Sequence, residues 1–227
     1  MKITVPSKFL LTFIRSAMVS CQCLYINAST EGVHLKSVDS TGTLTCLCFI
    51  AKEILSHHCR GRISFELDLR TLYTMLEVCG PTVTISGSIT NIMMLHTHND
   101  GNSCEYALQA HNIPHCEFNE QTVYDCIVHI PARTMICISK SAGKVVDICC
   151  CGNTVTFTSN GHHHHSTIVL ENHVMKHFDV DLKVSAYHLS NVVNEDTKMV
   201  VLHMSDGKVC METGSGGIHM KYYLNTI

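Results

Sequence analysis

Residues 67–94 read LDLRTLYTMLEVCGPTVTISGSITNIMM, and residues 184–211 read VSAYHLSNVVNEDTKMVVLHMSDGKVCM, which is 117 positions later (184 − 67 = 117). In both stretches apolar residues recur first at helical spacing and then at every second position. The matched apolar pairs include Leu72 with Leu189, Ile85 with Leu202, and Met94 with Met211. A period that changes at the same place twice indicates one supersecondary unit, a short helix followed by a strand pair, used in both halves. The sequence therefore predicts two similar domains in tandem.

The composition is that of a chain that can bury a sizeable core. The 227 residues carry a net charge of −3, and only 15% are charged. A role on nucleic acid would therefore need positive charge gathered on one face. The fourteen cysteines stand mostly inside apolar or β-type runs, where a reduced thiol behaves as a small hydrophobe. With neither a signal peptide nor a membrane-spanning run in the sequence, we expect a soluble, reduced, intracellular protein.

The hydrophobic pattern predicts an α+β fold, rich in strands, with two short helices in each half. A helix is expected from Ser7, which would cap it, a second ends at Cys79-Gly80-Pro81, and a third covers residues 131–141. Residues 57–61 are interpreted as a loop. The predicted domains are residues 1–110 and 126–227, joined by a polar connecting loop over residues 111–125.

Five segments stand in order along the chain: GVHLKSVDS at 32–40, the stretch 69–80, CIVHIP at 126–131, TVTFTSNG at 154–161, and HMKYYL at 219–224. The first is close to GVxLxSMDS and the last to HLKYYL, two patterns of the eukaryotic-type DNA sliding clamp. Over nearly its whole length the chain thus resembles the proliferating cell nuclear antigen family. It departs from the family by its compactness and by the absence of an acidic tail, which suggests a viral genome.

The resemblance implies two clamp domains per chain, whose helices line a surface that faces DNA, and three chains closed into a ring. Such a homotrimer encircles double-stranded DNA, catalyses nothing and needs no cofactor. Its partners would be a DNA polymerase, other replication or repair proteins that dock short peptides, and a clamp loader, with no membrane. It would act in the nucleus, or at a cytoplasmic replication site if viral. A monomeric or dimeric clamp-fold factor that holds DNA by charge is the alternative, and a checkpoint-type subunit of a hetero-ring is a third possibility.

The resemblance also places basic residues on the helices that face DNA. The candidates for phosphate contact are Lys8, Arg15, Arg70, Arg133, Lys140 and Lys198. Thr74 and Glu77 stand where the second helix of the family would be basic, so the predicted surface is less positive than usual. Exposed cations on an amphipathic helix are equally typical of an ordinary solvated face.

Two further surfaces follow from the resemblance. The subunit interface would pair the strand near residues 104–109 with the strand near residues 166–170 of the next chain, through Tyr106, Leu108, Thr167 and Val169. Client peptides would dock in an apolar pocket between the connecting loop and the C-terminal strand. Its predicted walls are Val38, Phe118, Tyr223, Leu224 and Asn225. Alternatively, Phe118 folds back to plug the domain junction.

A different class of function, a metal-dependent Cys/His enzyme, stays open at this point. His162-His163-His164-His165 invites a metal site or a pH sensor, and His57, His58, Cys59 and the cysteines at 149–151 could add ligands. Structural zinc sites need Cys/His pairs at fixed short spacings, and no pair-plus-pair arrangement occurs in the sequence. We therefore interpret the histidine run as a solvated turn, expect no metal, and expect no enzyme.

Overall fold

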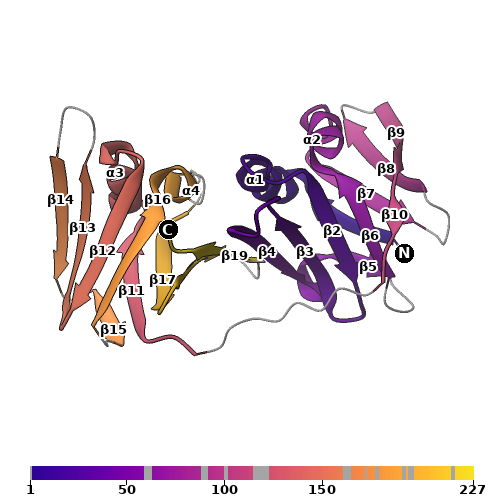
Figure 1. Cartoon of the computed structure of the whole chain (residues 1–227). Coiled ribbons are helices and arrows are strands. Elements are labelled where there is room, and N and C mark those ends of the chain that lie inside the picture. Colours follow the sequence, from indigo (N-terminus) through magenta and orange to yellow (C-terminus); the bar gives the residue numbers. More distant parts are fainter. Residues whose placement is uncertain are drawn as a thin grey trace. The chain divides into compact units, whose positions relative to one another are not determined.

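The computed structural model describes residues 2–58, 63–87, 92–99, 102–114, 123–160, 165–171, 173–176, 179–190, 193, 197–215 and 218–227. The chain divides into two compact units. The first consists of Met1–Gly42, Cys46–Phe118 and Gly216–Met220, and the second of Thr43–Thr45, Asn119–Ser215 and Lys221–Ile227. Each half of the chain consists of β-strands with a pair of α-helices on one side of them (Figure 1).

The elements of the first half, in chain order, are β1 Lys2–Pro6, α1 Ser7–Met18, β2 Cys23–Ala28, β3 Gly32–Val38, β4 Leu44–Ala51, the 3-10 helix η1 Lys52–Ile54, β5 Ser56–His58, β6 Ile63–Asp68, α2 Leu69–Glu77, β7 Thr82–Gly87, β8 Ile92–Asn99, β9 Asn102–Gln109 and β10 His111–Asn112.

The elements of the second half are β11 Cys126–Pro131, α3 Ala132–Ser141, β12 Val145–Cys151, β13 Thr154–Asn160, β14 His165–Glu171, β15 Val174–Lys176, β16 Val180–Ser185, α4 Ala186–Ser190, β17 Met199–Ser205, β18 Lys208–Ser215 and β19 Ile218–Asn225.

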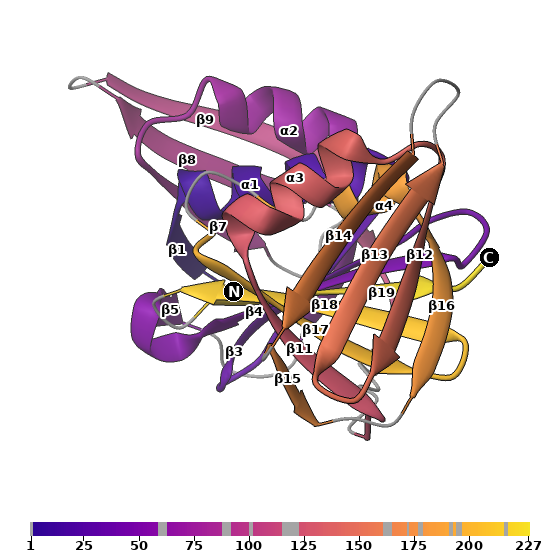
Figure 2. The same ribbon diagram turned by 90° about the vertical axis from the view of Figure 1, so that its left-hand side faces the viewer.

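The two halves repeat one strand order. In the first, hydrogen-bonded neighbours run β5-β1-β7-β8-β9 and β10-β6-β2-β3-β4; in the second, they run β15-β11-β17-β18-β19 and β16-β12-β13-β14. The described ladders, such as β1 with β7 and β11 with β17, are antiparallel. Figure 2 shows β14, β13, β12 and β16 side by side, with β14 outermost. The orders β5-β1-β7-β8-β9 and β16-β12-β13-β14 end in β9 and β14, each of which has one neighbour among the described strands.

The spacing of 117 residues recurs in the element boundaries. It separates the starts of β6 and β16 (180 − 63 = 117), of α2 and α4 (186 − 69 = 117), and of β7 and β17 (199 − 82 = 117). The predicted α+β fold with two similar domains is therefore confirmed, and the repeat seen in the sequence is a repeat of structure.

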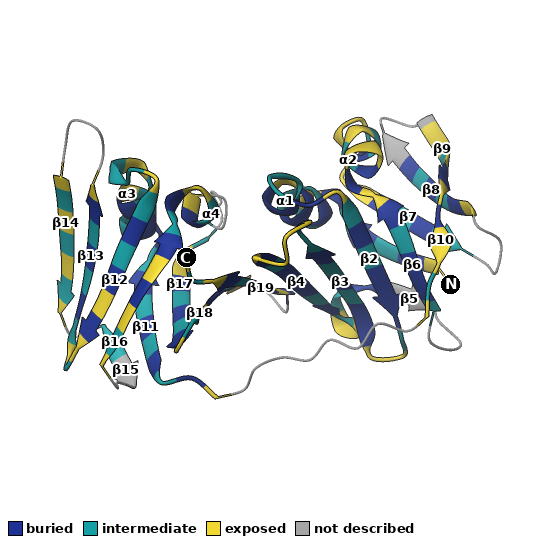
Figure 3. Cartoon of the chain, viewed as in Figure 1, coloured by how far each residue is buried: buried dark blue, intermediate teal, exposed yellow. Residues whose placement is uncertain are grey.

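The core of each half lies between its helices and strands. Along β13 buried residues alternate with partly exposed ones, because successive side chains of a strand point to opposite faces (Figure 3). The helices bury one stripe each: Phe13 and Ile14 of α1 are fully buried, and so are Leu72 of α2 and Leu189 of α4. At about 25 cal/mol per Å² of apolar surface, burial of such a side chain contributes roughly 1.5–3 kcal/mol.

The segment GVHLKSVDS is fixed by packing around β3. Gly32 has φ of +148°, and a Cβ on it would collide with the carbonyl oxygen of Ile50. Ser37 is fully buried, and its hydroxyl donates to the carbonyl oxygen of Cys23 at 2.9 Å. Glycine and serine at these two positions are thus explained by a close backbone approach and by a buried acceptor.

Two local predictions were wrong. Ser7 does not cap α1, because its side chain donates across the domain to the carbonyl oxygen of Gly80. His57 lies in a strand and not in a loop, since β5 pairs with β1 at Ile3. No helix within the described ranges is long and apolar enough to cross a membrane.

Candidate nucleic-acid interface

Helix α1 presents two of the predicted DNA-binding side chains. Lys8 and Arg15 lie about two turns apart, which places them on one side of the helix, and both are exposed. The opposite side buries Leu10, Phe13 and Ile14 against the strands. Because the apolar stripe is fixed in the core, the cations must point to solvent.

Helix α2 starts at an acidic cap. Asp68 accepts hydrogen bonds from the backbone N–H of Thr71 at 2.7 Å and from the Thr71 hydroxyl at 2.6 Å. These two bonds, with the nearby charge of Arg70, lower the pKa of the Asp68 carboxyl. Arg70, the third predicted contact residue, is exposed in the first turn. A capped helix of nine residues holds its remaining polar stripe, Tyr73, Thr74 and Glu77, in register with Arg70.

A polar network joins α1 to α2. The Nε of Arg15 donates to the hydroxyl of Tyr73 at 3.3 Å, and the guanidinium lies 5.7 Å from the centre of the Tyr73 ring. Arg15 Nη2 is 3.9 Å from Glu77 Oε1, and the Tyr73 hydroxyl donates to the same oxygen. Arg15 is therefore engaged by both residues, and its charge is partly offset.

Helix α3 carries Arg133 and Lys140, which are both exposed. The carbonyl oxygen of Lys198 accepts the N–H of Ala132 at 3.0 Å, so the exposed Lys198 lies at the start of α3 beside Arg133. None of the three residues Arg133, Lys140 and Lys198 makes an ion pair with any other described residue. The second half thus places three exposed cations at or near α3, and within the described residues none of them is paired with a carboxylate.

Helix α4 contributes aromatic surface and no lysine or arginine. It spans five residues, and its Tyr187 is 57% exposed. The rings of Tyr187 and His188 lie with centroids 5.9 Å apart.

The predicted subunit-interface residues lie on two strands with an open edge. β9 ends one strand order and β14 ends another. Val169 is 51% exposed and Thr167 is exposed on β14, whereas Leu108 of β9 is buried in its own unit and Tyr106 is half-buried. Leu108 could contribute only through its backbone.

The residues predicted to bind client peptides are spread over both units. Val38 ends β3 and is half-buried. In β19, Tyr223 is half-buried, Asn225 is exposed, and Leu224 is 1% exposed because it shares the inward face with Tyr222. The side chain of Leu224 therefore belongs to the core. Phe118 lies outside the described residues.

The metal chemistry considered from the sequence finds no assembled site in the described part of the chain. Among the described residues no group of three or more His, Cys, Asp or Glu side chains could hold a metal ion. His165 is bonded to Asn160 and Thr167, and residues 162–164 lie outside the described ranges. Burial raises the pKa of the Cys48 thiol to about 12, and so keeps it in the unreactive protonated form.

One pocket in the first unit has a volume of about 310 Å³ and lies beside the start of α2. Glu66 and Asp68 are in its wall together with Cys23, whose pKa is raised to about 11 by burial and by Glu66. Negative side chains repel phosphate, so this pocket is not part of a nucleic-acid surface.

The whole chain can be superposed on a clamp of known structure. It matches the crystal structure of proliferating cellular nuclear antigen from Entamoeba histolytica with a TM-score of 0.86, over 100% of this chain and 98% of that one. This chain has the proliferating cell nuclear antigen fold. The two sequences are 15% identical, so the likeness is one of fold. The sequence matches no protein-family model and no curated protein.

The clamp fold confirms the resemblance seen in the five segments, and the family with that fold is not enzymatic. Five of the six predicted contact residues lie on α1, α2 or α3, and Lys198 lies outside a helix, just before β17. The sequence reasoning noted Glu77 as a departure but missed that Glu77 pairs with Arg15. The spacing of Tyr73 and Glu77, one turn apart on α2, was the signal that could have revealed it.

Proposed function

We propose that this chain is a DNA sliding clamp, a processivity factor that tethers a polymerase to double-stranded DNA. The observation that carries the proposal is a full-length clamp fold in which α1, α2 and α3 expose cations opposite their buried stripes. The role requires no chemistry at a catalytic centre. It requires a surface that attracts phosphates without fixing one register.

Phosphate contacts of this kind suit sliding. Lysine and arginine side chains release counterions when they meet the DNA backbone, and they read no base sequence. Lys8, Arg15, Arg70, Arg133, Lys140 and Lys198 would supply them. A few such contacts per chain hold DNA weakly, so retention on DNA must come from enclosure by several chains.

Enclosure would be achieved by self-association through β9 and β14. Two exposed strands with unpaired backbone groups are a template for pairing between chains. Val169 and Thr167 would flank the new ladder on β14, and Tyr106 would flank it on β9. Three chains would give a ring of about 76 kDa (3 × 25.2 = 75.6).

Light scattering tests the assembly. We expect the mass of a trimer, and we expect Ala107→Pro to lower it, because proline removes a backbone donor from the exposed strand β9. Ala107→Ser, which keeps the donor, is the matched control. A wild-type chain that stays monomeric at high micromolar concentration would contradict the ring and favour the alternative, a clamp-fold factor that holds DNA by charge.

A second test addresses enclosure. Subunits diluted to dissociate and then concentrated around a plasmid should be retained on the closed circle after a high-salt wash. They should be lost from the linearised plasmid, because a ring slides off free ends. Equal retention on both forms would show that charge alone holds the protein.

Clients and cellular site follow from the same proposal. The polymerase, other replication or repair proteins and a loader would dock short extended peptides near Tyr223 of β19. The backbone N–H of Asn225 already donates to the carbonyl oxygen of Thr43 at 3.0 Å, so it would not serve the peptide. Tyr223→Ala should weaken a polymerase C-terminal peptide by about 1–3 kcal/mol in calorimetry, as loss of an aromatic anchor does. The protein would act where DNA is copied, in the nucleus or at a cytoplasmic viral site.

A further inference from the structure

We infer that Glu77, held by Tyr73, is an internal competitor for DNA phosphate at Arg15, so that α1 and α2 bind DNA more weakly than their cations alone would. The inference rests on the proposed function. It assigns Glu77 a role in setting affinity, and it assigns Tyr73 the role of positioning both charged side chains.

Arg15 is already in contact with Tyr73 and with Glu77. Its Nε donates to the Tyr73 hydroxyl at 3.3 Å, the guanidinium lies 5.7 Å from the ring centre, and Nη2 is 3.9 Å from the Glu77 carboxylate. The guanidinium fork that would bind a phosphate in two places is thus already directed toward a carboxylate. The hydroxyl of Tyr73 donates a hydrogen bond to the Glu77 carboxylate and keeps it in place.

The contacts among Arg15, Tyr73 and Glu77 lie on the two helices that carry the predicted DNA contacts of the first half. Tyr73 and Glu77 lie on the exposed stripe of α2 that begins with Arg70, and Arg15 lies on the exposed stripe of α1. α1 and α2 pack against each other (Figure 1). A DNA strand that reaches Arg15 therefore also meets the carboxylate of Glu77.

The ion pair between Arg15 and Glu77 is exposed to solvent. The side chains of Arg15 and Glu77 are 63% and 46% exposed, and exposed ion pairs are weak and screened by salt. A phosphate can thus replace Glu77, but it must do so next to a negative charge. Glu77 reduces the attraction of this surface for DNA without abolishing it.

The experiment is fluorescence anisotropy with a duplex of about 25 base pairs over a range of salt concentrations. Glu77→Gln keeps the shape of the side chain and removes its charge. We expect roughly threefold to tenfold tighter binding, and a log–log salt slope steeper by about 0.9, because Arg15 gains one phosphate contact. Tyr73→Phe should move both values in the same direction.

Replacement of Arg15 separates this inference from simple repulsion. Arg15→Gln should weaken wild-type binding by less than threefold, and it should abolish the gain produced by Glu77→Gln. If Glu77→Gln tightens binding equally with and without Arg15, the carboxylate acts by general repulsion and the inference is overturned.

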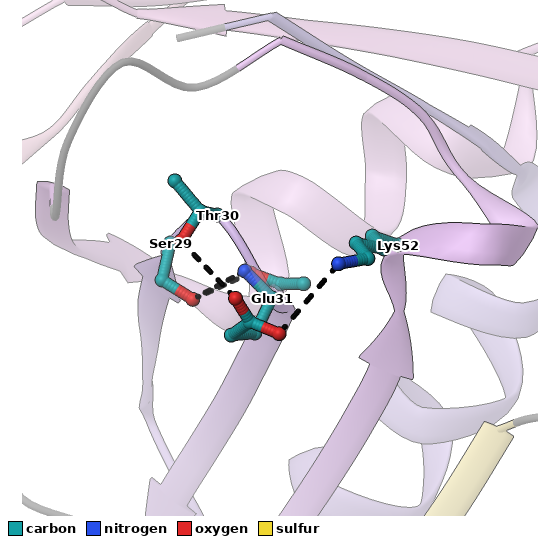
Figure 4. Close-up of polar contacts among 5 residues, drawn as sticks. Ser29, Thr30, Glu31 and Lys52 are labelled. Carbon is teal, nitrogen blue, oxygen red and sulfur yellow. Dashed lines mark hydrogen bonds and ion pairs between the residues drawn. The ribbon is translucent and has the colours of Figure 1, made fainter.

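The chain contains a matched control in Glu31, which pairs with Lys52 at 3.7 Å (Figure 4). Both side chains of that pair are exposed, and Glu31→Gln changes the net charge by the same unit. Glu31 lies in the turn that follows β2, after Ala28. The other end of β2, at Cys23, is the one that pairs with Asp68 at the start of α2, so Glu31 lies at the end of β2 away from α2. We expect the affinity of Glu31→Gln for the duplex to stay within twofold of wild type. An equal gain in both variants would attribute the effect to net charge and overturn the inference.

The outcomes also separate this inference from the proposed function. If DNA binding depends on Arg133 and Lys140 while Glu77→Gln changes nothing, only the role of Glu77 is lost. If neither wild type nor any variant binds the duplex at low salt, the proposed function falls, and the inference falls with it. Circular dichroism of each variant verifies that the fold is intact.

Discussion

The helix pair α1/α2 and the helix pair α3/α4 occupy equivalent places in the two halves but handle charge in different ways. In the first, Arg15 is held by Tyr73 and Glu77. In the second, Arg133 and Lys140 make no ion pair within the described part of the chain. The first pair is thus partly self-neutralised, and the second is open to an anion.

The difference teaches that a count of basic residues overstates the positive potential of a surface. α1 and α2 carry three of the six predicted contact residues, yet one is paired with Glu77 and another, Arg70, lies close to the Asp68 carboxylate. Arg133 and Lys140 of α3, by contrast, are exposed and make no ion pair with another described residue. We therefore expect the second half to dominate the salt-dependent part of DNA binding.

The largest effect is expected when the repeated core is broken. Leu72→Ala and Leu189→Ala remove equivalent, fully buried side chains of α2 and α4. Each should lower the free energy of unfolding by about 2–5 kcal/mol in a denaturant titration, because the cavity adds to the lost burial. Thr74→Ala, on the exposed side of α2, should change it by less than about 0.5 kcal/mol. A negligible loss at Leu189 alone would show that the helix pairs are not equivalent.

The second effect tests the contrast in charge directly. Arg133→Ala combined with Lys140→Ala should weaken duplex binding by at least roughly tenfold near 0.1 M salt, and should reduce the salt slope by about 1.8. Arg15→Ala should cost far less, because Glu77 already occupies that side chain. If the ranking is reversed in anisotropy, the self-neutralised pair is the main DNA contact and the comparison fails.

The third effect concerns the cap of α2. Asp68→Ala should lower stability at neutral pH by about 1 kcal/mol, through loss of the bonds from Thr71. Because the pKa of Asp68 is lower in the folded state, its contribution is complete above the unfolded carboxyl value of about 3.9 and is lost as pH falls through the folded value.

Asp68→Asn separates the hydrogen bonds from the charge. Asparagine caps helices about as well as aspartate, so stability at pH 7 should stay close to that of wild type. The acid-induced loss below about pH 4 should become shallower in urea titrations. An unchanged acid profile would mean that the cap does not act through ionisation.

The smallest effect is expected for the network itself. Glu77→Gln should change the free energy of unfolding by less than about 1 kcal/mol, since exposed ion pairs contribute little. Thermal melts in parallel with DNA titrations would then show a variant that alters binding and leaves stability intact. A large loss of stability would instead make the network part of the α1–α2 packing.

Periodicity predicted most of the fold because it records burial directly. The matched pairs such as Leu72 with Leu189 located the repeat of a helix followed by a strand pair. What failed depended on partners that are distant in the sequence. Ser7 has the side chain of a cap, but the carbonyl oxygen of Gly80 is its acceptor. β5 is three residues long, too short for a period to be visible, and it exists because β1 pairs with it.

The candidate site was predictable in outline only. Exposure of Lys8, Arg133 and Lys140 follows from helical spacing, whereas the engagement of Arg15 depends on how α1 packs against α2. Leu224 shows a related limit. An apolar residue near the C-terminus suits a pocket or a core equally well, and only the burial of Tyr222 on the same face of β19 decides between them.

The outer edge of β16 is partly covered by the backbone at Ile227. In the first half β10 pairs with β6, so that this edge is covered. The equivalent strand of the second half, β16, has no such neighbour in its order, but the N–H of Ile227 donates to the carbonyl oxygen of Lys183 at 3.0 Å. Uncovered edges invite off-pathway sheet growth. The backbone at Ile227 therefore shields part of an edge that could otherwise pair with another strand.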